Sequence, residues 1–170
     1  MFPTQSNTIA GQKVFIAGSD FTGLAGRVAK FANSAGLLVL SAIAALTDIP
    51  AALVVDENAA GKPVTGLPLD GSQNVRVTLK GACNPGDILV LADPATAADA
   101  GKVRALPAGA GVYVQVGLAE EIGVDGQLVL LRPDVKSVRV KSADTITGAA
   151  DLAALKVATL AILQAQGLVV

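Results

Sequence analysis

The densest group of residues able to do acid–base chemistry is a carboxylate cluster, Glu120, Glu121 and Asp125. Two carboxyl groups can act as acid and base when their surroundings hold them in different protonation states. Adjacent residues on a strand point to opposite faces, however, and "EEIGVDG" has the Gly and Asp that are typical of an exposed turn. The pattern therefore favours a solvated loop over a catalytic pair.

Side chains that common catalytic centres need are absent from the sequence. The chain has no histidine and one cysteine, Cys83, so it cannot build a Ser-His-Asp triad, a Cys-His pair or a zinc finger. The Gly-Lys pair at 61–62 is not a phosphate-binding loop, because Asp56 stands where the motif needs a glycine. Pro63 also takes the place of its Ser or Thr. We therefore predict no catalytic residue, no cofactor, no metal site and no enzymatic activity.

Charge and hydropathy argue against two further classes of partner. Charged residues make up 16% of the 170-residue chain, the formal net charge is −1 and no basic cluster occurs, so nucleic-acid binding is not expected. The most apolar window, 35–55, is interrupted by Asp48 and Pro50, whereas a membrane helix needs about 20 apolar residues. We therefore predict that Leu37 to Leu46 is buried core and not a membrane span. The first residues lack the basic and apolar pattern of a secretory signal.

A repeated phrase is the strongest internal pattern. "AGRVAKFANSAGLLV" is echoed by "AGKVRALPAGAGVYV", and residues 11–39 match residues 86–114 at an offset of 75. Further along, residues 74–81 match residues 137–144 at an offset of 63. The shorter offset predicts about twelve extra residues in the first unit, within about 40–71. Ala and Gly are abundant here, so chance matching competes with duplication as the explanation.

Both units have the pattern of short β-strands. "GQKVFIAG" and "GDILVLAD" are runs of β-branched and apolar residues, and "GRVAKF" and "GKVRAL" alternate apolar with basic residues. Strands this short, separated by Gly, Pro and Asp, favour an antiparallel sandwich or barrel over a parallel sheet. The predicted fold is mainly β, with two related antiparallel β units (small barrel or sandwich) and a C-terminal α-helix. The predicted parts are an arm at 1–10, unit 1 at 11–81 with the insertion at about 40–71, unit 2 at 86–142, and helix and tail at 144–170.

The predicted C-terminal helix has an apolar stripe. Leu152, Leu155, Thr159 and Ile162 fall at heptad a and d spacing, and Gly167 is placed to end the helix. An isolated helix of this length is marginal in water, so its apolar face must pack on something. Two interpretations stay open: the helix covers its own barrel, or it meets its copies around an oligomer axis.

Four segments of the second unit follow one another in a recognisable order. "GDILVLAD", "AGKVRALPAG", "VYVQVGLAEE" and "GQLVLLRP" form a Gly-Asp strand, a Gly-Lys-Val strand, a Val-rich strand ending in Gly-x-Ala and a closing strand. This order resembles that of bacteriophage capsid decoration (cement) domains, and the tail "AADLAALKVATLAILQAQGLV" is similar to the C-terminal helix of phage head-fibre and decoration proteins. The resemblance covers 86–140 best, 11–81 through the repeat and 147–170 by the tail pattern. The chain differs from the usual pattern in its double length and its insertion.

The resemblance implies a non-enzymatic virion protein, made in the host cytoplasm, that binds the outer capsid surface and stabilises the head. It implies the major capsid protein as partner and a homo-oligomer, with a trimer favoured. The residues themselves suggest one contact, because an extended N-terminal arm can add to a neighbouring sheet. We predict a capsid contact at Thr8, Ile9 and Ala10, with a self-packed terminus as the alternative.

Other classes of protein stay open at this point. The chain can be another virion shell, tube or fibre subunit, or a β-rich carbohydrate-binding or adhesion module. Sugar sites usually stack on aromatic rings, and the absence of Trp, with one Tyr and four Phe, counts against the carbohydrate module. An enzyme that uses carboxylates alone would reveal itself by a buried acid with a raised pKa.

Overall fold

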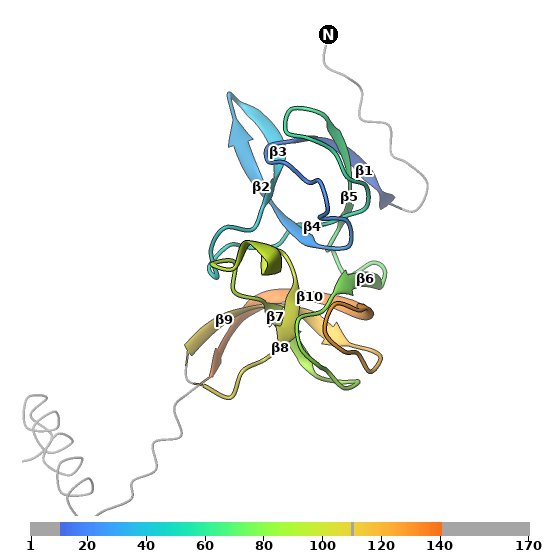
Figure 1. Ribbon diagram of the computed structural model, residues 1–170, viewed down its shortest axis with the longest axis vertical. Helices are drawn as coiled ribbons and strands as arrows, with labels where there is room; N and C mark the ends of the chain where they lie inside the picture. The colour runs from blue at the N-terminus through green and yellow to red at the C-terminus, as the bar shows by residue number, and fades with distance from the viewer. Residues whose placement is uncertain (1–10, 110, 141–170) are drawn as a thin grey trace, which may run out of the picture. The chain divides into compact units, whose positions relative to one another are not determined.

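The computed structural model describes residues 11–109 and 111–140, and the chain up to Val140 forms one compact unit. In this described part, ten strands build two sheets (Figure 1). The strands are β1 (Lys13–Ala17), β2 (Val28–Ser34), β3 (Leu37–Ala42), β4 (Ala52–Val54), β5 (Pro63–Pro68), β6 (Val75–Thr78), β7 (Ile88–Leu91), β8 (Val103–Ala105), β9 (Gly111–Ala119) and β10 (Leu128–Val140). A short 3-10 helix, η2 (Ala97–Asp99), precedes β8.

The first sheet is a closed barrel with the strand order β1-β3-β2-β4-β5. Its pairs are antiparallel except for β1 and β3, which run parallel with Ile16 opposite Val39. The sequence predicts antiparallel pairing throughout, and this prediction is wrong for β1 and β3. Five strands in a closed ring cannot all alternate in direction, so one neighbouring pair must be parallel. The residues of the predicted insertion fold into β4 and β5, the strands that close the ring.

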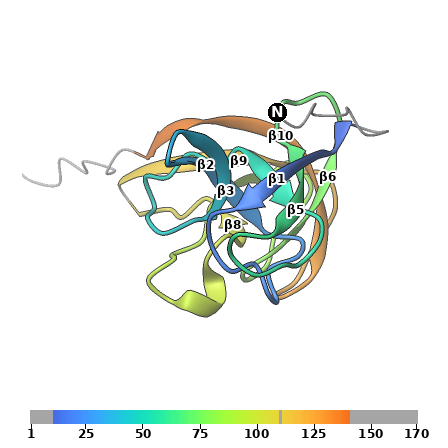
Figure 2. The same ribbon diagram turned by 90° about the horizontal axis from the view of Figure 1, so that it is seen from above.

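The second sheet is an open half-barrel with the order β6-β10-β9-β7-β8. Its longest strand, β10, pairs antiparallel with both β6 and β9, and its register shifts between Pro133 and Lys136. Figure 2 shows the bend of β10. A bulge of this kind bends the strand and increases its local twist, so one long strand can follow the curvature of the sheet.

Two apolar cores hold the sheets. The interior of the barrel contains Phe21 and Leu40, which are 1% and 0% exposed. The second core joins the sheets, because Val28 and Leu53 of the barrel pack with half-barrel residues such as Leu131. Cys83 is buried in this second core.

Both copies of the repeated phrase lie where the barrel meets the half-barrel, at a junction we call the seam. The backbone N–H of Val28 donates to the carbonyl of Gly101 at 2.8 Å, and the N–H of Thr78 donates to the carbonyl of Gly26 at 2.7 Å. The Arg27 guanidinium adds hydrogen bonds to the carbonyls of Ala98 and Ala100, both at 3.0 Å. The two Ala-Gly-Arg/Lys-Val phrases are therefore in contact with each other.

The mainly β prediction is confirmed, and the predicted strand positions recur in the structure. Strands β1, β2 and β3 stand at the positions that the repeat equates with β7, β8 and β9. Their pairing differs, since β2 pairs with β3 whereas β8 pairs with β7. Strand β6, within the predicted unit at 11–81, pairs with β10 of the second sheet. The internal repeat and the division into units stay predictions, and the predicted helix at 144–170 lies outside the described residues.

Candidate functional site on the barrel surface

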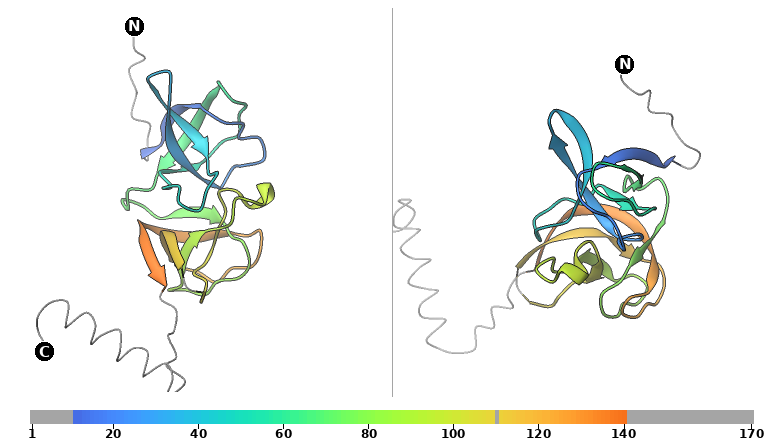
Figure 3. Two further views of the ribbon diagram at one scale, coloured as in Figure 1. Left: turned by 90° about the vertical axis from the view of Figure 1, so that its left-hand side faces the viewer. Right: turned by 45° about the horizontal axis from the view of Figure 1, so that its top comes forward.

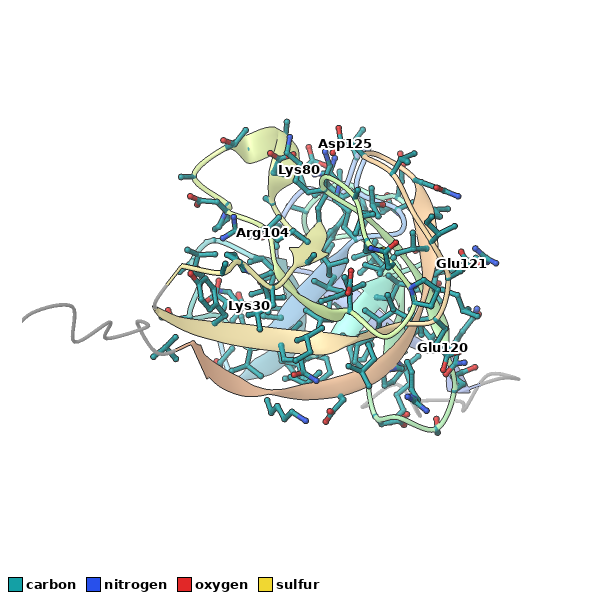
Figure 4. All side chains as sticks on the ribbon, turned by 90° about the horizontal axis from the view of Figure 1, so that it is seen from below. Lys30, Lys80, Arg104, Glu120, Glu121 and Asp125 are labelled. Carbon is teal, nitrogen blue, oxygen red and sulfur yellow. The ribbon has the colours of Figure 1, made fainter. Side chains whose placement is uncertain are left out.

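The carboxylates of the candidate cluster lie apart along the edge of the half-barrel (Figure 4). Glu121 accepts hydrogen bonds from the Arg76 guanidinium at 2.6 Å and from the Leu130 N–H at 2.9 Å. Asp125 accepts the N–H of Gly81 at 2.8 Å. These bonds connect neighbouring loops and strands, so the structure gives both carboxylates structural contacts.

A general acid needs a raised pKa, whereas the pKa of Glu121 is lowered. The hydrogen bond from Arg76, followed by that from the Leu130 backbone, lowers the pKa of this carboxyl below its ordinary value. The group is therefore ionised at neutral pH. Among residues 11–109 and 111–140, no group of three or more His, Cys, Asp or Glu side chains is placed to hold a metal ion.

The most distinctive surface feature is a set of exposed apolar side chains on β1, β2 and β3, which we call the barrel patch. It consists of Val14 (50% exposed), Ile16 (41%), Phe31 (41%), Leu37 (57%) and Leu38 (55%). Single exposed apolar residues are ordinary, but several of them on neighbouring strands are typical of an interaction surface. The barrel patch is therefore our candidate functional site.

Strand pairing places these side chains in two groups on opposite faces of the sheet, because adjacent residues such as Leu37 and Leu38 point to opposite sides. The parallel register that sets Ile16 opposite Val39 puts Val14 level with Leu37. The β2–β3 hairpin sets Phe31 opposite Leu40, two residues along β3 from Leu38. The ring of Phe31 also packs on that of Phe15, with 5.3 Å between centroids. Val14, Ile16 and Leu37 thus lie on the outer face of the barrel, whereas Phe31 and Leu38 lie on the face that continues into its interior.

The hairpin that carries the barrel patch has a tight and well-defined turn. Ser34 pairs with Leu37, so Ala35 and Gly36 alone form the loop, and both have positive φ, 50° and 81°. Two successive positive φ values are typical of a type I′ turn, whose twist matches that of paired strands. The N–H of Gly36 also donates to Oδ1 of Asn33 at 3.0 Å. Figure 3 shows the hairpin extending beyond its neighbouring strands.

The barrel patch was not predicted from the sequence. The prediction of buried core for Leu37 to Leu46 is wrong at Leu37, Leu38, Ala44 and Ala45, which are exposed, although Val39, Leu40 and Ile43 are buried. The signal was present in "LLVL": a strand that is apolar at successive positions has two apolar faces, and the barrel interior accepts one of them. The predicted sites at Thr8, Ile9 and Ala10, and at Leu152, Leu155, Thr159 and Ile162, lie outside the described residues.

By its fold, the described part of the chain is a two-sheet β protein: a closed β-barrel is joined to a β half-barrel, and the barrel carries exposed apolar side chains. No helix in the described ranges is long and apolar enough to cross a membrane.

Comparison with solved structures finds a similarity of fold. No protein-family model matches the sequence, and no match was found among curated proteins. The structure is similar to the crystal structure of the head fiber gp8.5 N base in bacteriophage phi29, with a TM-score of 0.54 and 22% sequence identity. The similarity covers 72% of this chain and 92% of that one. At this identity, the similarity establishes a shared fold.

Proposed function

We propose that this chain is a structural protein of a bacteriophage virion that binds the outer surface of the head and stabilises it as a decoration, or cement, protein. The observation that carries the proposal is the fold, shared over 92% of the length of a phage head-fibre base. The order of strand motifs in the second unit independently supports a capsid-bound module. The partner in this proposal is the major capsid protein.

The barrel patch is the proposed capsid contact. Burial of apolar surface contributes about 25 cal/mol per Å², so five partly exposed apolar side chains can supply a useful contact. A protein that binds the expanded head, and not its precursor, stabilises the expanded form by mass action. Several weak contacts within one oligomer would add through effective concentration. The predicted arm contact at Thr8, Ile9 and Ala10 stays a second prediction for the same partner.

A second candidate function is the base of a head fibre. The fold similarity to a protein described as a head-fibre N base favours it. In that role the chain would also bind the head surface, and the residues beyond Val140 would lead into a projecting structure. Cryo-electron microscopy of decorated heads separates the two candidates, because a cement protein lies flat on the shell and a fibre base carries a rod.

Binding to heads tests the proposal. Heads assembled from the major capsid protein of the same genome, in precursor and expanded forms, are mixed with the full chain and sedimented. We expect saturable binding to expanded heads and a higher temperature of head disruption. Replacing both Leu37→Asp and Leu38→Asp should weaken binding at least about tenfold, because one buried Leu side chain contributes about 1.5–3 kcal/mol.

The matched control is Val124→Asp. Val124 is 63% exposed on the half-barrel, outside the barrel patch, so one added carboxylate at this position should leave binding intact. Equal loss in both variants would contradict the patch as the contact. No sedimentation of the unmodified chain with either form of the head would contradict the head-binding function itself.

A further inference from the structure

Two buried polar atoms of the second sheet, Nε of Arg104 on β8 and Oε1 of Gln115 on β9, have no hydrogen-bond partner. Among residues 11–109 and 111–140, they are the buried side-chain nitrogen and oxygen atoms of which this is true. Gln115 as a whole is 1% exposed. Burying a polar group without a hydrogen bond costs free energy, so such groups usually bind another protein group or an ordered water. The two atoms therefore indicate a binding site.

The register of the strands places both side chains on one face of the sheet. Val90 of β7 lies opposite Arg104 on one side and opposite Gln115 on the other. Residues opposite each other on neighbouring strands project from the same face, so Arg104 and Gln115 flank the side chain of Val90. Val90 is 0% exposed but belongs to neither apolar core, which fits a cover made by its two long neighbours. We call these three residues the polar row.

A neighbouring carboxylate fixes the orientation of the Gln115 amide. Nε2 of Gln115 donates to Oδ2 of Asp134 at 2.9 Å, and the same carboxylate accepts from the ammonium of Lys136. Because an ionised carboxylate only accepts hydrogen bonds, the amide must turn its NH2 group toward Asp134 and its oxygen away. Oε1 of Gln115 therefore needs a donor, whereas the Nε–H of Arg104 needs an acceptor. No direct hydrogen bond joins these two atoms.

Two irregularities of the sheet meet at Gln115. The register of β7 against β9 shifts just before Val90, which leaves Val116 without an opposite residue on β7. The register of β10 against β9 shifts between Pro133 and Lys136, so β10 has two residues there where β9 has one. A bulge disrupts the ladder locally and leaves an extra residue unpaired. Backbone groups outside the regular ladder are therefore available beside the polar row.

We propose that the polar row binds one ordered water molecule. The water accepts the Nε–H of Arg104 and donates to Oε1 of Gln115, which satisfies both buried atoms. Its second hydrogen is left for a backbone carbonyl at the bulges. Buried waters typically make about three hydrogen bonds to polar groups that lack another partner.

The chemistry of the two atoms favours water over an ion. An anion would pair with Arg104 but would also face the negative end of the Gln115 amide, and a cation would be repelled by the guanidinium. Strands lie about 4.8 Å apart, so the Cα atoms of Arg104 and Gln115, with β7 between them, are roughly 10 Å apart. Their side chains span most of this distance, and one bridging water spans the rest. The proposal does not depend on the virion function.

A crystal structure of the full chain, at a resolution that shows ordered waters, tests the proposal. We expect one water within about 3.2 Å of both Nε of Arg104 and Oε1 of Gln115. A direct hydrogen bond between these two atoms, with no water, would overturn the proposal.

Magnetic relaxation dispersion of the water oxygen nucleus counts long-lived waters in solution. Arg104→Met and Gln115→Met each remove one partner of the water but keep a flexible, unbranched side chain, so each should lower the count by one. Arg132→Met is the matched control, because the side chain of Arg132 is 59% exposed and lies outside the polar row. Circular dichroism checks that each variant is folded. An equal count in the unmodified chain and in both variants of the polar row would contradict the site.

Discussion

At the scale of single residues, Gly26 and Gly101 explain why the chain repeats a phrase. Both have positive φ, 76° and 75°, a region that side chains with a Cβ rarely adopt. Ala100, at φ −55° and ψ 124°, and Gly101 form a type II turn that the N–H of Lys102 closes onto the carbonyl of Asp99. At the seam, each glycine carbonyl accepts a hydrogen bond from the neighbouring sheet or strand. The repeated glycines therefore serve both turn geometry and close packing.

Replacing Gly101→Ala should destabilise the protein more than Gly86→Ala. Both positions have positive φ, so each alanine costs about 1–2 kcal/mol from backbone strain. At Gly101 the new Cβ would also lie 2.6 Å from the carbonyl oxygen of Val28, whereas nothing lies within 4 Å of it at Gly86. The expected losses in free energy of unfolding are about 3 kcal/mol and about 1 kcal/mol. Urea unfolding followed by circular dichroism measures both, and equal losses would contradict a role for Gly101 in the seam.

At the scale of elements, the sequence predicted where strands lie better than how they pair. Apolar runs bounded by Gly, Pro and Asp locate β1, β7 and β8 within a residue or two, because these signals are local. The β1–β3 parallel pair and the β6–β10 pair depend on barrel closure and on contacts distant in sequence. The barrel patch escaped prediction for the same reason, since "LLVL" does not reveal which of its faces meets the interior.

Asp48 stabilises the connection between β3 and β4, and its effect should depend on pH. Its carboxylate pairs with Lys30 at 2.8 Å and accepts the N–H groups of Ala44 and Ala45. Burial acts to raise the pKa of Asp48, but the Lys30 hydrogen bond and the two backbone bonds together outweigh it and lower the pKa. The ionised form is therefore favoured by folding. Its stabilisation is present above the unfolded pKa, near pH 4, and is lost as pH falls through the lower folded value.

Asp48→Ala should accordingly lower the free energy of unfolding by about 1–2 kcal/mol at pH 7, since partial exposure screens the ion pair. The difference from the unmodified protein should narrow below about pH 4, as the native carboxyl becomes protonated. Urea unfolding at pH 7 and at lower pH measures the gap, and Glu57→Ala, an exposed carboxylate, is the control. A gap that is independent of pH would show that the loss comes from packing and not from charge.

At the scale of the whole molecule, the seam joins two differently closed sheets into one unit. The closed barrel has no free edge and presents the barrel patch, whereas the open half-barrel keeps β6 as an edge strand. Composition predicted a β protein with surfaces for assembly. Composition could not locate these surfaces, because the barrel patch and the β6 edge both lie where segments distant in sequence meet.

The oligomeric state is the last property that belongs to this scale. We predict a trimer from the resemblance to decoration proteins, formed through the predicted helix at 144–170, which lies outside the described residues and whose sequence has Leu152, Leu155, Thr159 and Ile162 at heptad spacing. We expect light scattering to give the mass of a trimer for the full chain and of a monomer for a chain ending at Ser142, which keeps the compact unit up to Val140. Replacing Leu155→Asp in the full chain should also give a monomer, because a charge in the apolar stripe of the predicted helix prevents apolar packing between copies. A monomeric full chain would instead mean that the head surface supplies the symmetry, and that the stripe packs within its own chain.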